Sequence, residues 1–176
     1  MSAKIMTSVG IDSARINLAS LNILLFDTDR ISASVTKLAL QQSDHLNFIL
    51  CDNQETACQY HQDRPFNIAL VDFTPTRFSP SAHLVRELRN PYKFEQSPRI
   101  AALLSTANKQ VLKAVIKAGV DTAWVKPLSP DVIQKKMISL LRAEIPYVTI
   151  DDYRGPDRRR VPTDIDYDGE ERRQDE

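Results

Sequence analysis

Side chains that can bind or accept a phosphoryl group follow four short apolar stretches of this sequence. Asp27 and Asp72 end two such stretches, Ser105 and Thr106 follow a third, and Lys126 follows a fourth. Formation of an aspartyl phosphate needs a carboxylate nucleophile, a second carboxylate to hold a divalent cation, and hydroxyl and ammonium groups to bind the phosphoryl oxygens. The combination predicts phosphoryl transfer to an aspartate, with Asp72 as the acceptor.

The apolar stretches alternate with segments in which apolar residues recur at helical spacing. Strands are predicted at 21–26, 46–51, 66–71, 100–104 and 122–125, and helices at 30–42, 53–62, 81–90, 108–118 and 130–143. This alternation predicts an α/β fold, a doubly wound parallel sheet of five strands with helices on both faces. Ligands of such sheets bind at the carboxyl ends of the strands, which is where these side chains fall.

Four segments of the chain resemble the signature segments of response-regulator receiver domains in two-component signalling. They are ILLFDTD, IALVDFTP, IAALLSTA and AGVDTAWVKP, in the family's order over about residues 21–143. The last is the most specific, because Ala118-Gly119 and Lys126-Pro127 stand at the family's separation. The resemblance implies a flavodoxin-like sheet of strand order 2-1-3-4-5, and a cis peptide bond before Pro127.

The same resemblance implies a role for individual residues. Asp72 corresponds to the phosphoacceptor, Thr106 to the switch hydroxyl and Lys126 to the lysine that binds the phosphoryl group; Ser105 stays open as an alternative to Thr106. The chain would then be a stand-alone response regulator rather than an enzyme. It would accept its phosphoryl group from a histidine kinase or a phosphotransfer protein and signal through protein–protein contacts.

Mg²⁺ is the cofactor that the resemblance implies. Its ligands would be Asp27, Asp72 and the backbone carbonyl of Thr74, with Asp29 as a further candidate, although Asp29 is also predicted to cap the helix over 30–42. Thr28 stands where the family usually has the second of two adjacent acids. Because a hydroxyl is a weak ligand for Mg²⁺, weak metal binding is expected.

Two alternatives to phosphoacceptor function stay open. Ala123 stands where the family often has a switch aromatic, and Trp124 beside it should face the other side of its strand. Together with Thr28, this favours a phosphorylation-independent pseudo-receiver that acts as a protein-binding adaptor. A small hydrolase or phosphatase with Asp72 as nucleophile ranks last, because Thr74 stands where a second acid would be expected.

Charge is unevenly distributed although the net charge is +0. Residues 151–176 contain ten acidic residues and six arginines. We therefore expect an N-terminal arm at 1–20, the receiver domain at 21–145 and a disordered tail at 146–176. The tail repeats the pattern D-Y-x-G-x-[DE]-R-R at 152–159 and 166–173, which is either a solvated low-complexity feature or a tandem docking motif for an unknown protein.

Composition argues against several other classes of protein. A neutral chain with acids around its arginines is not expected to bind nucleic acid, and no apolar stretch is long enough to span a membrane. Cys51 and Cys58 lack the spacing of a zinc site and read as reduced thiols, which predicts a cytoplasmic protein. His45, His61 and His83 have no metal-ligand partners in sequence and are expected at the surface.

Overall fold

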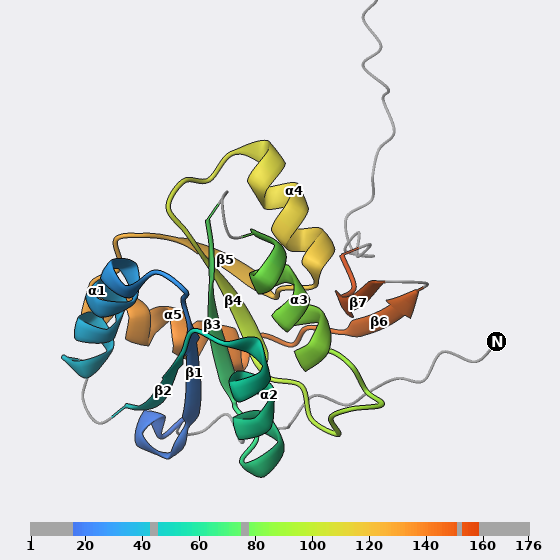
Figure 1. The fold of residues 1–176 in the computed structure, drawn as a ribbon, viewed down its shortest axis with the longest axis horizontal. Helices are drawn as coiled ribbons and strands as arrows, with labels where there is room; N and C mark the ends of the chain where they lie inside the picture. Colours follow the sequence, from blue (N-terminus) through green and yellow to red (C-terminus); the bar gives the residue numbers. More distant parts are fainter. Residues whose placement is uncertain (1–15, 43–45, 75–77, 151–152, 159–176) are drawn as a thin grey trace, which may run out of the picture.

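The structure is a computed structural model, and it describes residues 16–42, 46–74, 78–150 and 153–158. A short 3-10 helix, Leu18–Ser20, precedes the sheet. The strands of the main sheet are β1 (Asn22–Phe26), β2 (Asn47–Cys51), β3 (Ile68–Phe73), β4 (Arg99–Leu104) and β5 (Thr122–Val125). The helices are α1 (Arg30–Gln41), α2 (Gln54–Asp63), α3 (Phe78–Leu88), α4 (Lys109–Ala118) and α5 (Pro130–Arg142). All five strands run parallel in the order β2-β1-β3-β4-β5, as predicted (Figure 1).

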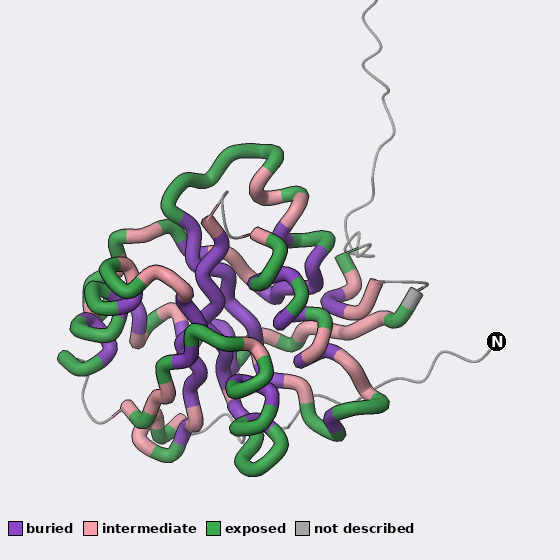
Figure 2. Tube along the Cα trace, viewed as in Figure 1, coloured by how far each residue is buried: buried purple, intermediate pink, exposed green. Residues whose placement is uncertain are grey.

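Helices cover both faces of this sheet. One core lies between the sheet and α2, α3 and α4, and the other lies between the sheet and α1 and α5 (Figure 1). The central strands β1 and β3 are buried nearly throughout, because their residues alternate between two covered faces (Figure 2). Trp124 packs in the α1/α5 core while Ala123 faces the other core, so the predicted opposite orientation of these two residues is confirmed.

The helix ends follow the sequence chemistry. Four helices are preceded by a residue whose side chain accepts hydrogen bonds from backbone N–H groups of the first turn. These residues are Asp29, Asn53, Asn108 and Ser129. Helix α4 ends at Gly119, whose φ of 99° lies in the left-handed region that favours glycine. Within the described ranges, no helix is long and apolar enough to cross a lipid bilayer.

The expectation of disorder from residue 146 onward is wrong for the first part of the tail. Strands β6 (Tyr147–Ile150) and β7 (Tyr153–Pro156) form an antiparallel hairpin. The hairpin lies beside the ends of α3 and α4, where Arg154 donates a hydrogen bond to Asn90 (Figure 1). The rest of the predicted tail and most of the predicted N-terminal arm lie outside the described residues.

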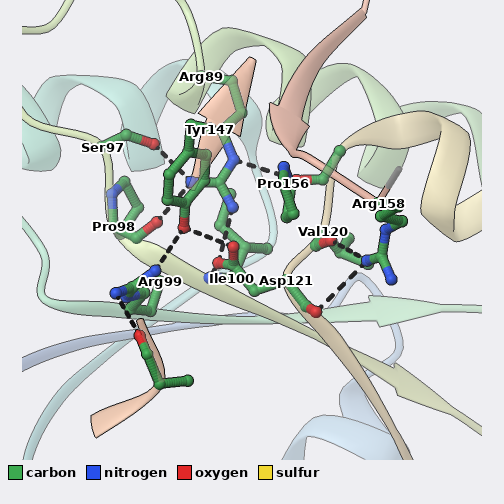
Figure 3. Close-up of polar contacts among 12 residues, drawn as sticks. Arg89, Ser97, Pro98, Arg99, Ile100, Val120, Asp121, Tyr147, Pro156 and Arg158 are labelled. Carbon is green, nitrogen blue, oxygen red and sulfur yellow. Dashed lines mark hydrogen bonds and ion pairs between the residues drawn. The ribbon is translucent and has the colours of Figure 1, made fainter. Parts of the chain in front are cut away.

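A buried polar cluster explains why this charged segment is ordered. Arg89 and Asp121 form an ion pair of 2.7 Å with both side chains almost fully buried. Tyr147 of β6 donates its hydroxyl hydrogen to Asp121, accepts a hydrogen bond from Arg99 and stacks on the Arg89 guanidinium, 4.9 Å from the ring centre (Figure 3). The charge composition of residues 146–176 predicted disorder because it does not include Asp121 and Arg89, which lie far from Tyr147 in the sequence.

His61 is a second departure from expectation, because it is buried with 1% of its surface exposed. Its Nδ1 accepts a hydrogen bond from the Phe66 backbone N–H, and its Nε2 lies 2.9 Å from the Gln96 carbonyl oxygen. The ring therefore joins α2 to two loops instead of facing solvent. His83 is exposed as expected, and His45 lies outside the described residues.

Candidate functional site

The candidate site lies at the carboxyl edge of the sheet. Register pairs Phe26 with Val71, Asp72 with Leu103 and Leu104 with Val125, so β1, β3, β4 and β5 end at nearly the same level. Parallel strands therefore place the residues that follow them side by side. The predicted edge and its order of strands are both present.

Asp72 lies in β3, one residue before the strand ends, and is 2% exposed. Its Oδ1 is ion-paired with the ammonium group of Lys126, which follows β5. The hydroxyl of Ser81 in α3 donates a hydrogen bond of 2.5 Å to the Asp72 backbone carbonyl. The contact from α3 fixes the backbone of Asp72, while Lys126 supplies the positive charge that a buried carboxylate requires.

Lys126 is held in place by a second contact. Its Nζ lies 2.7 Å from the Ser32 hydroxyl in the first turn of α1, and its backbone N–H donates to Leu104. The Lys126-Pro127 peptide bond is cis, as the resemblance implied. Sequence reasoning missed Ser32, although the start of a helix that follows the first strand must lie at this edge.

Asp27 brings a second buried carboxylate to the same edge. It is 2% exposed, and its Oδ1 accepts a hydrogen bond of 2.8 Å from the Asp29 backbone N–H. Its Oδ2 is buried and has no hydrogen-bond partner among the residues that the structure describes. A buried carboxylate oxygen without a partner is costly, so this atom is available to a cation.

The residues present fit Mg²⁺, because the implied donor set is made of hard oxygen atoms. It comprises the carboxylates of Asp27 and Asp72 with the backbone carbonyl of Thr74. The Asp29 carboxylate caps α1 by accepting from Ile31 and Ser32, which ties Asp29 to the helix. In the described part of the chain, no group of three or more histidine, cysteine, aspartate or glutamate side chains could hold a metal, so the set has two acids only.

The remaining predicted residues lie at the rim of the site. Ser105 and Thr106 follow β4, and both are exposed at this edge. Thr28 follows Asp27 and is half-buried. Ala123 leaves the switch-aromatic position without a ring.

Cys51 ends β2 next to the site, where its carbonyl accepts a hydrogen bond from the Asp27 N–H. Burial, with the negative charge of Asp52 adding to it, raises the pKa of the Cys51 thiol to about 11. The thiol is therefore protonated and unreactive at neutral pH. Cys58 is also buried, and burial raises the pKa of its thiol too.

Comparisons with known proteins agree on the fold. No protein-family model and no curated protein sequence matches the chain. Among solved structures, a response regulator from Thermotoga maritima is similar over 70% of this chain and 98% of its own, with a TM-score of 0.57 and 21% identity. A signal receiver domain from Bermanella marisrubri covers 69% of this chain and 98% of its own, at TM-score 0.55 and 22% identity.

A third similar structure is the chemotaxis protein CheY4 of Vibrio cholerae, with a TM-score of 0.57 and 16% identity. It covers 68% of this chain and 98% of its own length. At these identities the likeness concerns the fold. The chain has the fold of a response-regulator receiver domain.

Proposed function

We propose that this chain is a response-regulator receiver that accepts a phosphoryl group on Asp72 and signals through protein contacts. The observation that carries the proposal is the Asp72–Lys126 ion pair beside the unpartnered Oδ2 of Asp27. A nucleophilic carboxylate, a positive charge for the phosphoryl oxygens and a carboxylate for a cation then stand at one sheet edge. The phosphodonor would be a histidine kinase or a phosphotransfer protein.

Each residue has a defined part in this proposal. The Asp72 carboxylate attacks the phosphorus atom of the donor's phosphohistidine, the P–N bond breaks and the imidazole leaves. Lys126 binds an oxygen of the transferred group. Thr106 donates a hydrogen bond to another oxygen once the phosphoryl group is in place. Asp27, Asp72 and the Thr74 carbonyl would hold Mg²⁺, which would neutralise part of the phosphoryl charge. Ser32 positions Lys126, and Ser81 positions the Asp72 backbone.

The likeness to structures described as response regulators and receiver domains supports signalling instead of catalysis on a small substrate. The hypothesis of a small hydrolase or phosphatase requires a second acid two residues after Asp72, and the chain has Thr74 there. We place the protein in the cytoplasm, where histidine kinases expose their phosphodonor domains.

The direct test is to incubate the purified chain with Mg²⁺ and a small-molecule phosphodonor and to measure its intact mass. We expect the mass of one phosphoryl group to be added, and no addition in Asp72→Asn, which keeps the shape of the side chain. Asp131→Asn, a change at an exposed acid in α5, is the matched control and should be phosphorylated normally. No adduct across a wide series of Mg²⁺ concentrations would contradict the proposal.

Thr28 and Ala123 favour one second candidate, a pseudo-receiver that binds a protein without being phosphorylated. It keeps the fold and the Asp72–Lys126 pair as structural features. The same experiment separates the two, because a pseudo-receiver gives no adduct, and Asp72→Asn should then leave partner binding unchanged.

A further inference from the structure

The first copy of the tail repeat packs against a short backbone segment of the main domain. We call Gly119, Val120 and Asp121, which connect α4 to β5, the tail dock. Gly155 of β7 packs against Gly119, and the guanidinium of Arg158 donates to the Val120 carbonyl at 2.7 Å and to the Asp121 carbonyl at 3.3 Å (Figure 3). The dock therefore offers a glycine surface and two carbonyl acceptors.

The Tyr-x-Gly part of the repeat is what permits this close approach. A Cβ added to Gly155 would lie 2.9 Å from the Gly119 Cα and 2.9 Å from the Tyr153 hydroxyl oxygen. Gly155 is thus enclosed between the dock and the ring of Tyr153, whose hydroxyl donates to the Pro156 carbonyl. A Cβ at position 155 would therefore collide with the backbone of the dock, and the Tyr153 ring covers the glycine on the other side.

The second copy of the repeat keeps each of these residues. Tyr167, Gly169 and Arg172 stand at the same mutual spacing as Tyr153, Gly155 and Arg158, fourteen residues later. Residues 159–176, which include the second copy, lie outside the described part of the chain. The hydrogen-bond partners of Arg158 are backbone carbonyls, so an arginine at the same position of another strand can use them equally.

The copies differ at three positions, and the difference at Arg154 adds a contact to the first copy. Arg154 donates to Asn90 and lies 5.2 Å from the centre of the Tyr92 ring, whereas the second copy has Asp168 there. The first copy thus has an additional contact with the α3–β4 loop. This explains why the first copy occupies the dock in the intact chain.

We propose that the second copy, Tyr167–Arg172, is an alternative occupant of the tail dock of its own chain. In the exchange β6 and its Tyr147 contacts stay in place, and the second copy replaces β7 beside it. The connection from β6 then lengthens by fourteen residues, and the cost of closing a loop rises only slowly with its length. A tethered segment is present at an effective concentration of roughly millimolar, so it outcompetes the tail of another molecule. The proposal goes beyond the phosphoacceptor function and does not depend on it.

The four glycines of the chain make the exchange directly measurable. In full-length protein labelled with ¹⁵N-glycine, Gly119 reports on the dock, Gly155 and Gly169 report on the two copies, and Gly10 is a reference. The series is the wild type, Gly155→Val, Gly169→Val and the double variant, and each substitution assigns the signal that it removes.

In Gly155→Val we expect the Gly119 signal to stay near its wild-type position while the Gly169 signal shifts. Gly169→Val, the matched control, should leave Gly119 unchanged, and the double variant should move it. The proposal is overturned if Gly155→Val moves Gly119 as far as the double variant does and leaves Gly169 in place. It is also overturned if the Gly119 position in Gly155→Val depends on protein concentration, which would mean that another molecule fills the dock. Arg158→Ser with Arg172→Ser repeats the series without added bulk.

Discussion

Asp72 carries a negative charge that is shielded from water, so its environment decides what it can do. A buried carboxylate is tolerated when a counter-charge and hydrogen bonds surround it. Lys126 supplies the counter-charge here, and Ser32 and Ser81 fix the two partners from α1 and α3. Because α1 and α3 hold this pair, a phosphodonor would meet a preorganised site. The proposed metal site has two acids only.

Placing an acid at position 28 tests the proposed metal site. Thr28→Asp adds a carboxylate beside Asp27, and a further negative ligand should tighten Mg²⁺ binding on the order of tenfold. The Mg²⁺ concentration for half-maximal phosphorylation should fall by this factor in the intact-mass assay. Thr28→Asn, which has the same shape without the charge, should stay near the wild type. An unchanged Mg²⁺ requirement in Thr28→Asp would place residue 28 outside the metal site.

Asp121 is the acid on which the second buried cluster depends. Burial alone would lower the pKa of Arg89, but Asp121 and Tyr147 outweigh it and raise the pKa, so the guanidinium stays charged. Asp121→Ala leaves this charge buried without its partner and also removes an acceptor from the Ile100 N–H. We expect the free energy of unfolding to fall by about 3–5 kcal/mol in urea titrations. Asp63→Ala, at an exposed acid, should change it by less than about 0.5 kcal/mol.

His61 makes the fold sensitive to mild acid. Burial lowers the pKa of His61 from 6.5, and the hydrogen bond to the Gln96 carbonyl only partly opposes this. Above pH 6.5 the ring is neutral in both folded and unfolded chains, so its contribution to stability is complete. As the pH falls below 6.5, the His61 ring takes up its proton in the unfolded chain before it does so in the folded chain. The free energy of unfolding therefore falls by at most about 1.4 kcal/mol per pH unit.

The measurement is the urea midpoint at pH 7.5 and at pH 5.5 for the wild type and for His61→Gln. The wild type should lose more stability between the two conditions than the variant loses, because the variant has no proton to bind at position 61. Equal losses in the two proteins would mean that other groups carry the acid sensitivity.

At the scale of elements, the features that depend on neighbouring residues could be predicted from the sequence. The features that depend on residues far apart in the sequence could not. The five strands could be predicted because apolar runs such as Ile68–Val71 are buried on both faces. The helices could be predicted because apolar residues recur at helical spacing and because Asp29 caps the first of them. Asp72 and Lys126 were predicted to lie at one sheet edge because each stands at the end of a strand, and the structure brings them together. The hairpin was missed because its order depends on Arg89 and Asp121, which no local pattern connects to Tyr147.

Gly119 is the residue at which helix α4 and the hairpin meet. Gly119→Ala strains a backbone with φ of 99° and brings a Cβ to within 2.4 Å of the Arg154 carbonyl oxygen. The backbone strain alone should cost about 1–2 kcal/mol of stability. The hairpin should also leave the domain, which would be seen as faster tryptic cleavage after Arg154.

Gly155→Ala is the matched control for that variant. It blocks the same contact from the side of the hairpin without straining the C-terminal cap of α4. Cleavage after Arg154 should therefore accelerate in both variants, whereas the larger loss of stability should be confined to Gly119→Ala. Slow cleavage in both would show that the glycine contact does not hold the hairpin.

For the molecule as a whole, the sheet separates two polar clusters. Asp27, Asp72 and Lys126 lie at the carboxyl ends of the strands. Arg99 opens β4 and Asp121 precedes β5, so the cluster that binds the hairpin lies at the amino ends. Removing the hairpin should therefore lower the free energy of unfolding clearly, while it should change the phosphorylation of Asp72 little.

Ending the chain at Ile145 tests this separation. The shortened chain loses Tyr147 and Arg158 as partners of Asp121, Arg99 and the tail dock. At about 1 kcal/mol for each hydrogen bond, the free energy of unfolding should fall by roughly 2–3 kcal/mol. Asp72 should still gain a phosphoryl group at the wild-type Mg²⁺ requirement. If shortening the chain instead changed that requirement, the hairpin would act on Asp72 across the sheet, and β5, which joins Asp121 to Lys126, would be the element through which it acts.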